Sequence, residues 1–389
     1  MQLAMEGDLL MHKPRIAIVG GGPGGLTLAR ILHLHGIHAA VFEREKFSLV
    51  RPQGGSLDMH ADAGQYAIEC AGLTAEFKRI ARYEDQESRI YDKHGKLLLL
   101  EEDVTDKDRP EVDRGHLRQM LLDSLPAGVV RWDHELNAIQ PQDDGTFELI
   151  FRSGARERFD LVVGADGAWS RVRLLVSQAQ PTYSGVVFVE LGIDDVDARE
   201  PELARLMGRG LTFALGDSKA LIGHRDANAH LGIHAALRAP EDWIEKGGLD
   251  LSSPNAMRTS LAAHFSDWSS DLLELIYRSG DRMTPRAIHA LPVGHRWENR
   301  PGVTLLGDAA HLMSPFGGDG ANLAMQDAAD LALALIREDW KTAVRSYEAT
   351  MFARAEPAAA GAWGAINEVF SEDGLTHILE QMEGHRRQG

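Results

Sequence analysis

The sequence predicts an α/β fold with two domains, one built on a parallel sheet and the other on an antiparallel sheet. The chain has 389 residues, which is long for a single hydrophobic core. Its N-terminal part opens with a short apolar run, a glycine-rich turn and an amphipathic segment, the order of a strand, a turn and a helix. Between residues 180 and 283 apolar and polar residues alternate, which is typical of an antiparallel sheet.

The composition is that of a folded, acidic protein. Apolar residues make up 44% of the chain and charged residues 25%, an ordinary globular mixture. The formal net charge of −17 repels phosphate backbones and anionic lipids, so we expect neither nucleic acid nor a membrane as a partner. The one cysteine, Cys70, permits no internal disulfide, and no segment reaches the ~18 apolar residues of a membrane-spanning helix. A cytoplasmic protein is predicted, and no protein partner is implied.

The first strand, turn and helix carry a phosphate-binding pattern. A strand predicted at 15–19 ends in glycines, and Gly20, Gly22 and Gly25 have the G-x-G-x-x-G spacing. The first glycine allows a tight turn, the second lets backbone approach a pyrophosphate, and the third lets the helix pack on the strand. A second strand at 39–42 ends in Glu43 and Arg44, where an acid can bind an adenosine ribose. A dinucleotide is therefore predicted, but this unit does not distinguish FAD from NAD, which share the ADP half.

Two later segments also follow predicted buried strands. Asp166 opens the run DGAWSRVR after residues 159–164, and Asp308 opens the run DAAHLMSPFGGDGAN after residues 303–306. An aspartate at a strand end can accept hydrogen bonds from cofactor hydroxyls. A glycine-rich loop that opens a helix can present amides and the positive helix end to an anionic ring. The candidate residues of this loop are Gly318, Gly320, Ala321 and Asn322.

These runs match the D-G-x-x-S-x-x-R and G-D-A-A-H-x-x-x-P-x-x-G-x-G-x-N signatures, so the chain resembles the class A FAD monooxygenases of the p-hydroxybenzoate hydroxylase fold. Within that group it is most similar to the tetracycline-inactivating monooxygenases, through RPQGGSLDMH at 51–60 and RGHLR at 114–118. The resemblance implies a Rossmann-like domain with non-covalent FAD, and NADPH and O2 as co-substrates. It also implies that a flavin C4a-hydroperoxide hydroxylates an electron-rich phenol or enol carbon, so no catalytic side chain is expected.

The resemblance also assigns roles to residues. It implies that Arg51 contacts NADPH, and that Asp58, Arg118 and Asp308 contact FAD. Gly54 and Gly55 are expected to let the flavin ring move between two positions. The implied domains are an FAD-binding domain at 1–77, 105–180 and 284–337, a substrate domain at 78–104 and 181–283, and a C-terminal bridging segment at 338–389, helical with a break near Pro357.

The substrate pocket is expected on the antiparallel sheet, over strands near 186–193, 211–215, 221–224 and 230–237. In the tetracycline-inactivating relatives a glutamine, an arginine and a histidine hold the drug. Here the histidine aligns with His230, the glutamine becomes Glu190, and the arginine's place falls near Gly210. No carboxylate or cysteine completes a metal site with the histidines of these strands, so no metal is expected. The candidate substrate residues are Glu190, Phe213, His230, Gly232, Pro315 and Phe316.

Three functions stay open on the sequence alone. Tetracycline inactivation is the best single prediction. A hydroxylase of a smaller aromatic or polyketide metabolite is the alternative within the same chemistry. A flavin-binding sensor without turnover is the alternative from another class. A flavin halogenase is disfavoured because the chain has no W-x-W-x-I-P run.

Overall fold

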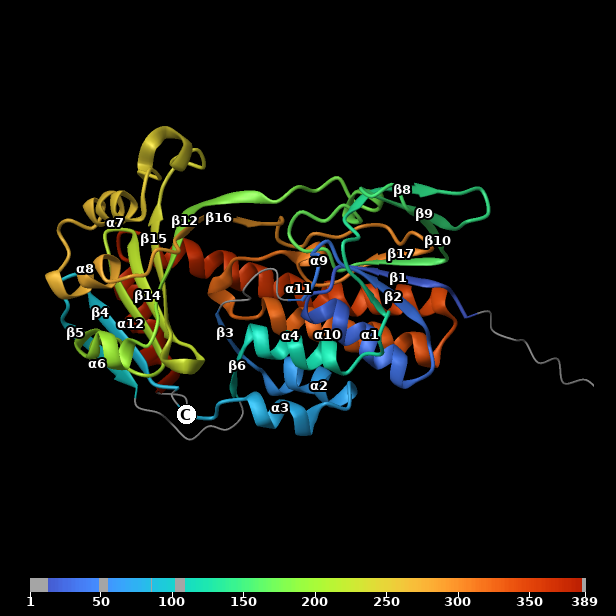
Figure 1. The fold of residues 1–389 in the computed structure, drawn as a ribbon, viewed down its shortest axis with the longest axis horizontal. Coiled ribbons are helices and arrows are strands. Elements are labelled where there is room, and N and C mark those ends of the chain that lie inside the picture. The colour runs from blue at the N-terminus through green and yellow to red at the C-terminus, as the bar shows by residue number, and fades with distance from the viewer. Residues whose placement is uncertain (1–12, 49–54, 85, 102–108, 387–389) are drawn as a thin grey trace, which may run out of the picture.

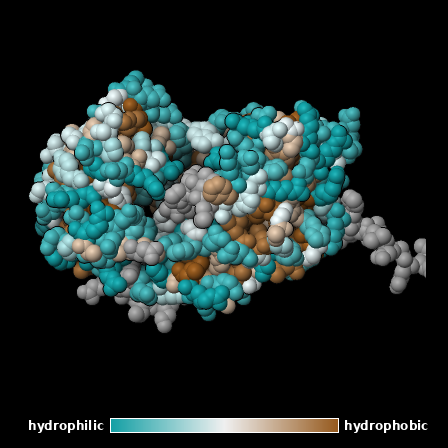
Figure 2. All heavy atoms as spheres, viewed as in Figure 1, coloured by the Kyte–Doolittle hydropathy of each residue, from teal (hydrophilic) through white to brown (hydrophobic). Residues whose placement is uncertain are grey.

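The computed structural model describes residues 13–48, 55–84, 86–101 and 109–386. It has two lobes, each with its own sheet, and long helices run along and between them (Figure 1). The predicted α/β fold with a second α+β region is confirmed. Arg51 and Gly54 lie outside the described residues. The face shown in Figure 2 is largely hydrophilic, with apolar side chains gathered in small areas.

The sheet of the first lobe is parallel throughout and has β1 at its centre. All four residues of β1 are buried, because both faces of the sheet are covered. Ile18 of β1 lies in register between Val163 and Val41 on the neighbouring strands. The strands follow the order β17 (Val303–Leu305), β11 (Leu161–Gly164), β1 (Ile16–Val19), β2 (Ala39–Phe42) and β7 (Val130–Arg131).

Helices cover one face of this sheet and a small antiparallel sheet covers the other (Figure 1). On the second face Phe42 packs against Phe151 and Phe159, with ring centroids 4.7 and 5.6 Å away. The small sheet consists of β8 (Leu136–Pro141), β9 (Phe147–Phe151) and β10 (Arg156–Phe159). The helices are α1 (Pro23–Leu34), α2 (Tyr66–Cys70), α3 (Thr74–Ile80), α4 (Arg114–Asp123) and α10 (Gly320–Arg337), and a ribbon of β3 (Ser56–Asp58) and β6 (Glu111–Asp113) leads toward the second lobe.

The second lobe holds a seven-stranded sheet in the order β16-β12-β15-β14-β13-β4-β5. The expected antiparallel pairing holds at every neighbour except β13 and β4, which are parallel, because the β4–β5 hairpin joins the sheet from an earlier part of the chain. The strands are β4 (Ser88–Asp92), β5 (Leu97–Glu101), β12 (Thr182–Ile193), β13 (Leu211–Gly216), β14 (Lys219–Arg225), β15 (Leu231–Arg238) and β16 (Thr284–Ala290).

β16 lies in the segment that the sequence assigned to the FAD-binding domain, and it pairs instead with β12 of the second lobe. Most residues of β16 are half-buried, so apolar and polar residues do not alternate clearly along it and no strong strand pattern is present there. One face of the large sheet is covered by α6 (Pro201–Met207), α7 (Pro254–Ala263) and α8 (Ser270–Tyr277), with Leu221 and Ile233 in the core between them. The other face carries Phe188 and Ile222 and packs against Phe316 of the first lobe.

The C-terminal part consists of α11 (Trp340–Val369) and α12 (Gly374–Arg386). The predicted break near Pro357 is wrong, because α11 runs through this proline. Proline costs about 3 kcal/mol inside a helix. Here Ala355, Ala359 and Ala362 on the same helix are buried, and this packing holds the helix together. The chain turns instead after Phe370, and α12 packs along the second lobe. No helix of the described residues is long and apolar enough to span a bilayer.

Candidate active site

The turn between β1 and α1 has no room for a side chain at two of its three predicted glycines. A Cβ at Gly20, where φ is +111°, would lie 2.2 Å from the carbonyl oxygen of Ala165. A Cβ at Gly25 would lie 2.1 Å from the carbonyl oxygen of Gly20. At Gly22, by contrast, no described atom lies within 4 Å of the Cβ position. Gly20 and Gly25 therefore serve packing, whereas Gly22 leaves the backbone open to an approaching group.

Glu43 and Arg118 brace this turn. Glu43 accepts hydrogen bonds from the backbone N–H groups of Gly21 and Glu45, at 2.8 and 3.0 Å. The buried Arg118 guanidinium donates from Nε to the Gly21 carbonyl at 3.0 Å. Both predicted FAD residues thus lie beside the turn, and some of their hydrogen bonds go to the protein backbone. Arg44 is exposed at the same edge of the sheet.

The loop after β11 is held by Asp166 and Arg173. The Asp166 carboxylate accepts from the Ser170 hydroxyl at 2.5 Å and from the Arg171 N–H at 2.8 Å, and burial raises its pKa. Arg173, 1% exposed, donates to the Ala309 carbonyl at 3.0 Å. The D-G-x-x-S-x-x-R run therefore ties the loop after β11 to the loop after β17, a bracing role that the sequence did not reveal.

Asp308 begins α9 (Asp308–His311) at the end of β17. Asp308 keeps access to solvent, yet many protein atoms lie around it. The resulting desolvation raises the pKa of the carboxyl, although the positive charges of His311 and Arg114 act to lower it. No described residue donates a hydrogen bond to this carboxylate. Asp308 is therefore available as an acceptor for a bound molecule.

Asp327 of α10 holds the same loop from behind. Its fully buried carboxylate accepts from the Gly307 N–H at 3.0 Å, from His311 Nε2 at 2.7 Å and from Arg354 Nη2 at 2.7 Å. Burial alone would raise the pKa of Asp327, but the charges of His311 and Arg354 outweigh it and lower that pKa. Asp327 is not among the site residues predicted from the sequence.

Asn322 joins the start of α10 to the segment after β3. Its Oδ1 accepts the N–H groups of His60 and Gly64, at 2.9 and 3.2 Å, and its Nδ2 donates to the Asp58 carbonyl at 2.9 Å. Asn322 is therefore a clamp within the protein. Just before it, α10 begins at Gly320 without a side-chain cap, so its first amides are left for another acceptor.

The face of the large sheet that packs against Phe316 carries aromatic side chains and a row of residues with two polar members; we call it the inner face. The row crosses four neighbouring strands and consists, in order, of Glu190 (β12), His234 (β15), Ile222 (β14) and Phe213 (β13). Cross-strand partners point to the same face of a sheet. The ring of Phe188 lies 5.4 Å from His234 and 6.0 Å from Phe316, which is itself 5.5 Å from Phe370.

The structure brings Glu190, Phe213 and Phe316 together on this face, but it separates them from His230. The His230 ring lies one row further along the sheet, over Gly192, where it bonds Asp194 at 2.7 Å. Gly232 faces Gly192 in that row, and Pro315 is exposed. The sequence places His234 on the same strand face as His230, but it predicts His230 as the substrate residue, because strand register cannot be read from a single sequence.

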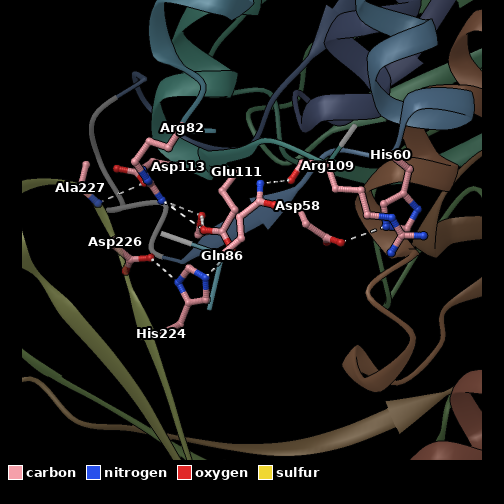
Figure 3. A network of polar contacts seen from close by, with 11 residues as sticks. Asp58, His60, Arg82, Gln86, Arg109, Glu111, Asp113, His224, Asp226 and Ala227 are labelled. Carbon is pink, nitrogen blue, oxygen red and sulfur yellow. Dashed lines mark hydrogen bonds and ion pairs between the residues drawn. The ribbon is translucent and has the colours of Figure 1, made fainter. Parts of the chain in front are cut away.

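A partly buried polar cluster joins the two lobes at the β3–β6 ribbon (Figure 3). His224 of β14 contacts Glu111 at 2.8 Å and Asp226 at 3.4 Å. Arg82 pairs with Asp113 and lies 3.5 Å from Glu111. We call these five residues the His224 cluster. Burial lowers the pKa of His224, but hydrogen bonds and charge from Asp226 and Glu111 raise it to about 9.

The His224 cluster should make stability fall at alkaline pH. The pKa of His224 is raised above its ordinary value of 6.5, so the protonated form stabilises the fold fully below pH ~6.5, and this contribution is lost as pH rises through about 9. The loss amounts to at most about 3 kcal/mol. Urea unfolding at pH 6.5 and 9.5 measures it, and His224→Gln should remove most of the difference. An unchanged pH dependence in the variant would contradict this assignment.

Comparison with known proteins gives the family. The family model described as an FAD binding domain matches residues 13–214 and 289–362. Monooxygenase penA of Penicillium thymicola is 32% identical over 427 residues, which cover 95% of this chain and 98% of the relative. The 3-amino-4-hydroxybenzoate 2-monooxygenase PtnB3 of Streptomyces platensis is 30% identical and covers 87% of this chain and 84% of its own. The chain belongs to the class A FAD-dependent monooxygenases.

Solved structures share the fold of the monooxygenase. HpxO of Klebsiella pneumoniae, complexed with FAD and uric acid, has a TM-score of 0.79 at 22% identity and covers 95% of this chain and 92% of its own. Tetracycline destructase Tet(51) has a TM-score of 0.71 at 23% identity and covers 96% of this chain and 94% of its own. These identities establish the fold alone.

The site of the monooxygenase fits FAD. The open backbone at Gly22 suits a pyrophosphate, the Asp308 carboxylate can accept from hydroxyls, and the start of α10 at Gly320 offers amides to an anionic ring edge. Gly55, just before β3, has φ of +89° and no described atom within 4 Å of its Cβ position. The roles of individual residues toward FAD and NADPH stay predictions.

Proposed function

We propose that the monooxygenase uses NADPH and O2 to hydroxylate an electron-rich carbon of a flat, uncharged aromatic or polycyclic molecule. The observation that best supports this is the inner face of the second lobe. There Phe188, Phe213 and Phe316 surround the row that contains His234, and Phe316 comes from the loop after Asp308. Bound FAD supplies the oxygen activation, while the side chains of this face bind the substrate, orient it and exclude water.

His234 is our candidate for the group that orients the substrate. Burial lowers the pKa of its imidazole, so the ring is neutral at pH 7. Its side chain makes no hydrogen bond to another described residue. A neutral imidazole can accept the hydrogen bond or the proton of a substrate hydroxyl, which enriches the ring carbon in electrons.

The charge on this face favours an uncharged substrate. Glu190 pairs with Arg286 at 2.5 Å, so the guanidinium nearest the row is already neutralised. Among the described residues of this face, a carboxylate substrate would find no unpaired cation. The carboxylate of Glu190 also disfavours an anionic β-diketone such as that of tetracycline. We therefore favour a smaller aromatic or polyketide metabolite over tetracycline, the prediction from sequence.

The test is substrate-stimulated NADPH oxidation and O2 uptake by the FAD-loaded protein, with mass spectrometry for a product heavier by one oxygen atom. The panel contains uncharged hydroxylated bicyclic aromatics, 3-amino-4-hydroxybenzoate and tetracycline. Turnover of an uncharged aromatic supports the proposal. Turnover of the benzoate or of tetracycline alone would overturn the substrate class, and no NADPH consumption with any compound would favour a flavin-binding sensor.

The role of His234 is tested with the best compound of that panel. We expect His234→Gln to lower kcat/KM by about 100-fold, the lower range for loss of a proton acceptor. His230→Gln is the matched control, because its ring lies in the next row and is bonded to Asp194. Equal losses in the two variants would contradict a special role for His234.

A further inference from the structure

His60 lies between two aspartates beside the loop that begins α10. Its Nε2 is 3.0 Å from Asp58 Oδ2, and its Nδ1 is 3.6 Å from Asp319 Oδ1. The imidazole is 13% exposed, and the His60 N–H is fixed by Asn322 Oδ1 at 2.9 Å. The ring is thus held from both sides by opposite charge. We call Asp58, His60 and Asp319 the His60 cluster.

The charges of the His60 cluster are coupled. The hydrogen bond with Asp58 raises the pKa of His60, and the charge of Asp319 adds to this, which favours the imidazolium. Burial opposes ionisation of Asp58, but His60 and Arg109 outweigh it and lower the pKa of Asp58. Burial and the nearby Asp58 raise the pKa of Asp319. Figure 3 shows the side chain of Arg109 beside His60, and its positive charge acts to lower the pKa of His60.

The His60 cluster lies against the loop at 315–320 that leads into α10, where FAD is expected to bind. A Cβ at Gly318 would lie 3.7 Å from Asp58 Oδ1, and a Cβ at Gly320 would lie 4.0 Å from Asp308 Oδ1. The carboxylates of Asp58 and Asp308 therefore both lie close to the backbone of this loop. FAD gains negative charge on reduction, which the α10 N-terminus favours and nearby carboxylates oppose.

We propose that the imidazolium of His60 offsets the carboxylates of Asp58 and Asp319 and thereby raises the reduction potential of FAD bound at the start of α10. The inference rests on the assignment of FAD to this loop and is independent of the substrate. His60 acts here through its charge, as a residue that tunes the cofactor, and not as a group that takes part in the chemistry.

The experiment is an anaerobic redox titration of the FAD-loaded protein against a reference dye. His60→Gln removes the positive charge and should lower the equilibrium constant for two-electron reduction at least tenfold, a shift of about −30 mV. Asp319→Asn removes a negative charge at the same place and should shift the potential in the opposite direction by a similar amount. The double variant should return close to the wild-type potential.

Potential shifts of opposite sign in the two variants distinguish an effect of charge from a general disturbance of the site, because a disturbance would shift the potential in the same direction in both. Shifts of equal sign, or none, overturn the proposal. If His60→Gln retains no FAD, Asp319→Asn decides alone, and an unchanged or lower potential overturns it. Failure of the wild-type chain to bind FAD would instead refute the cofactor assignment, which the visible absorbance of the loaded protein reports directly.

Discussion

Asp327→Ala should lower the free energy of unfolding by about 3–5 kcal/mol, the usual cost of removing one partner from a buried ionic network. The substitution leaves the Arg354 guanidinium and the His311 imidazole without their shared carboxylate, and leaves the Gly307 N–H unpaired. Urea unfolding of the FAD-free protein, followed by tryptophan fluorescence, measures the loss without a contribution from cofactor release.

Asp330→Ala is the matched control for this effect. Asp330 lies on the same helix and pairs with the other terminal nitrogen of Arg354 at 2.7 Å, but it is partly exposed and pairs with no second cation in the part of the chain that the structure describes. We expect a loss of about 1 kcal/mol or less. Similar losses in the two variants would show that Asp327 does not organise the loop after β17.

Gly25→Ala and Gly22→Ala should separate folding from FAD binding. A methyl group at Gly25 meets the Gly20 carbonyl at 2.1 Å, so the turn must open, and we expect a loss of stability of about 1–3 kcal/mol together with loss of FAD. At Gly22 the methyl group meets no described atom within 4 Å and φ is −81°, so the stability of the FAD-free protein should change by less than about 0.5 kcal/mol.

The affinity for FAD should nevertheless fall at least tenfold in Gly22→Ala, because the methyl group lies where backbone must approach the pyrophosphate. Thermal unfolding of the FAD-free variants and titration with FAD, followed by flavin fluorescence, give the two quantities separately. Unchanged FAD affinity in Gly22→Ala would mean that the phosphates bind elsewhere.

The first lobe is predictable from sequence because its information is local. The strand before Gly20, the turn and the helix up to Leu34 are contiguous in sequence, and the contact that requires Gly25 lies within this unit. The contact that requires Gly20 is with Ala165, which follows the neighbouring strand β11. The roles of Asp166 and Asn322 are less local. Both belong to recognisable motifs, yet their hydrogen bonds go to protein groups that a motif does not name.

The second lobe is predictable as a sheet but not as a site. Alternation places the strands, whereas the partner of each residue depends on register between distant segments. The choice between His234 and His230 needs the structure, which places His234 opposite Glu190 and the His230 ring over Gly192. In the same way the alanine-rich packing around Pro357 outweighs the local signal for a helix break.

The route of the chain has a consequence for synthesis of the protein. β11 ends at Gly164, but its partner β17 begins only at Val303, and β12 to β16 of the seven-stranded sheet lie between them in the chain. The edge of β11 therefore stays open on the ribosome while residues 165–302 are added, and parallel strands this far apart in sequence pair slowly. We expect the nascent polypeptide to depend on chaperones until Leu305 has left the exit tunnel.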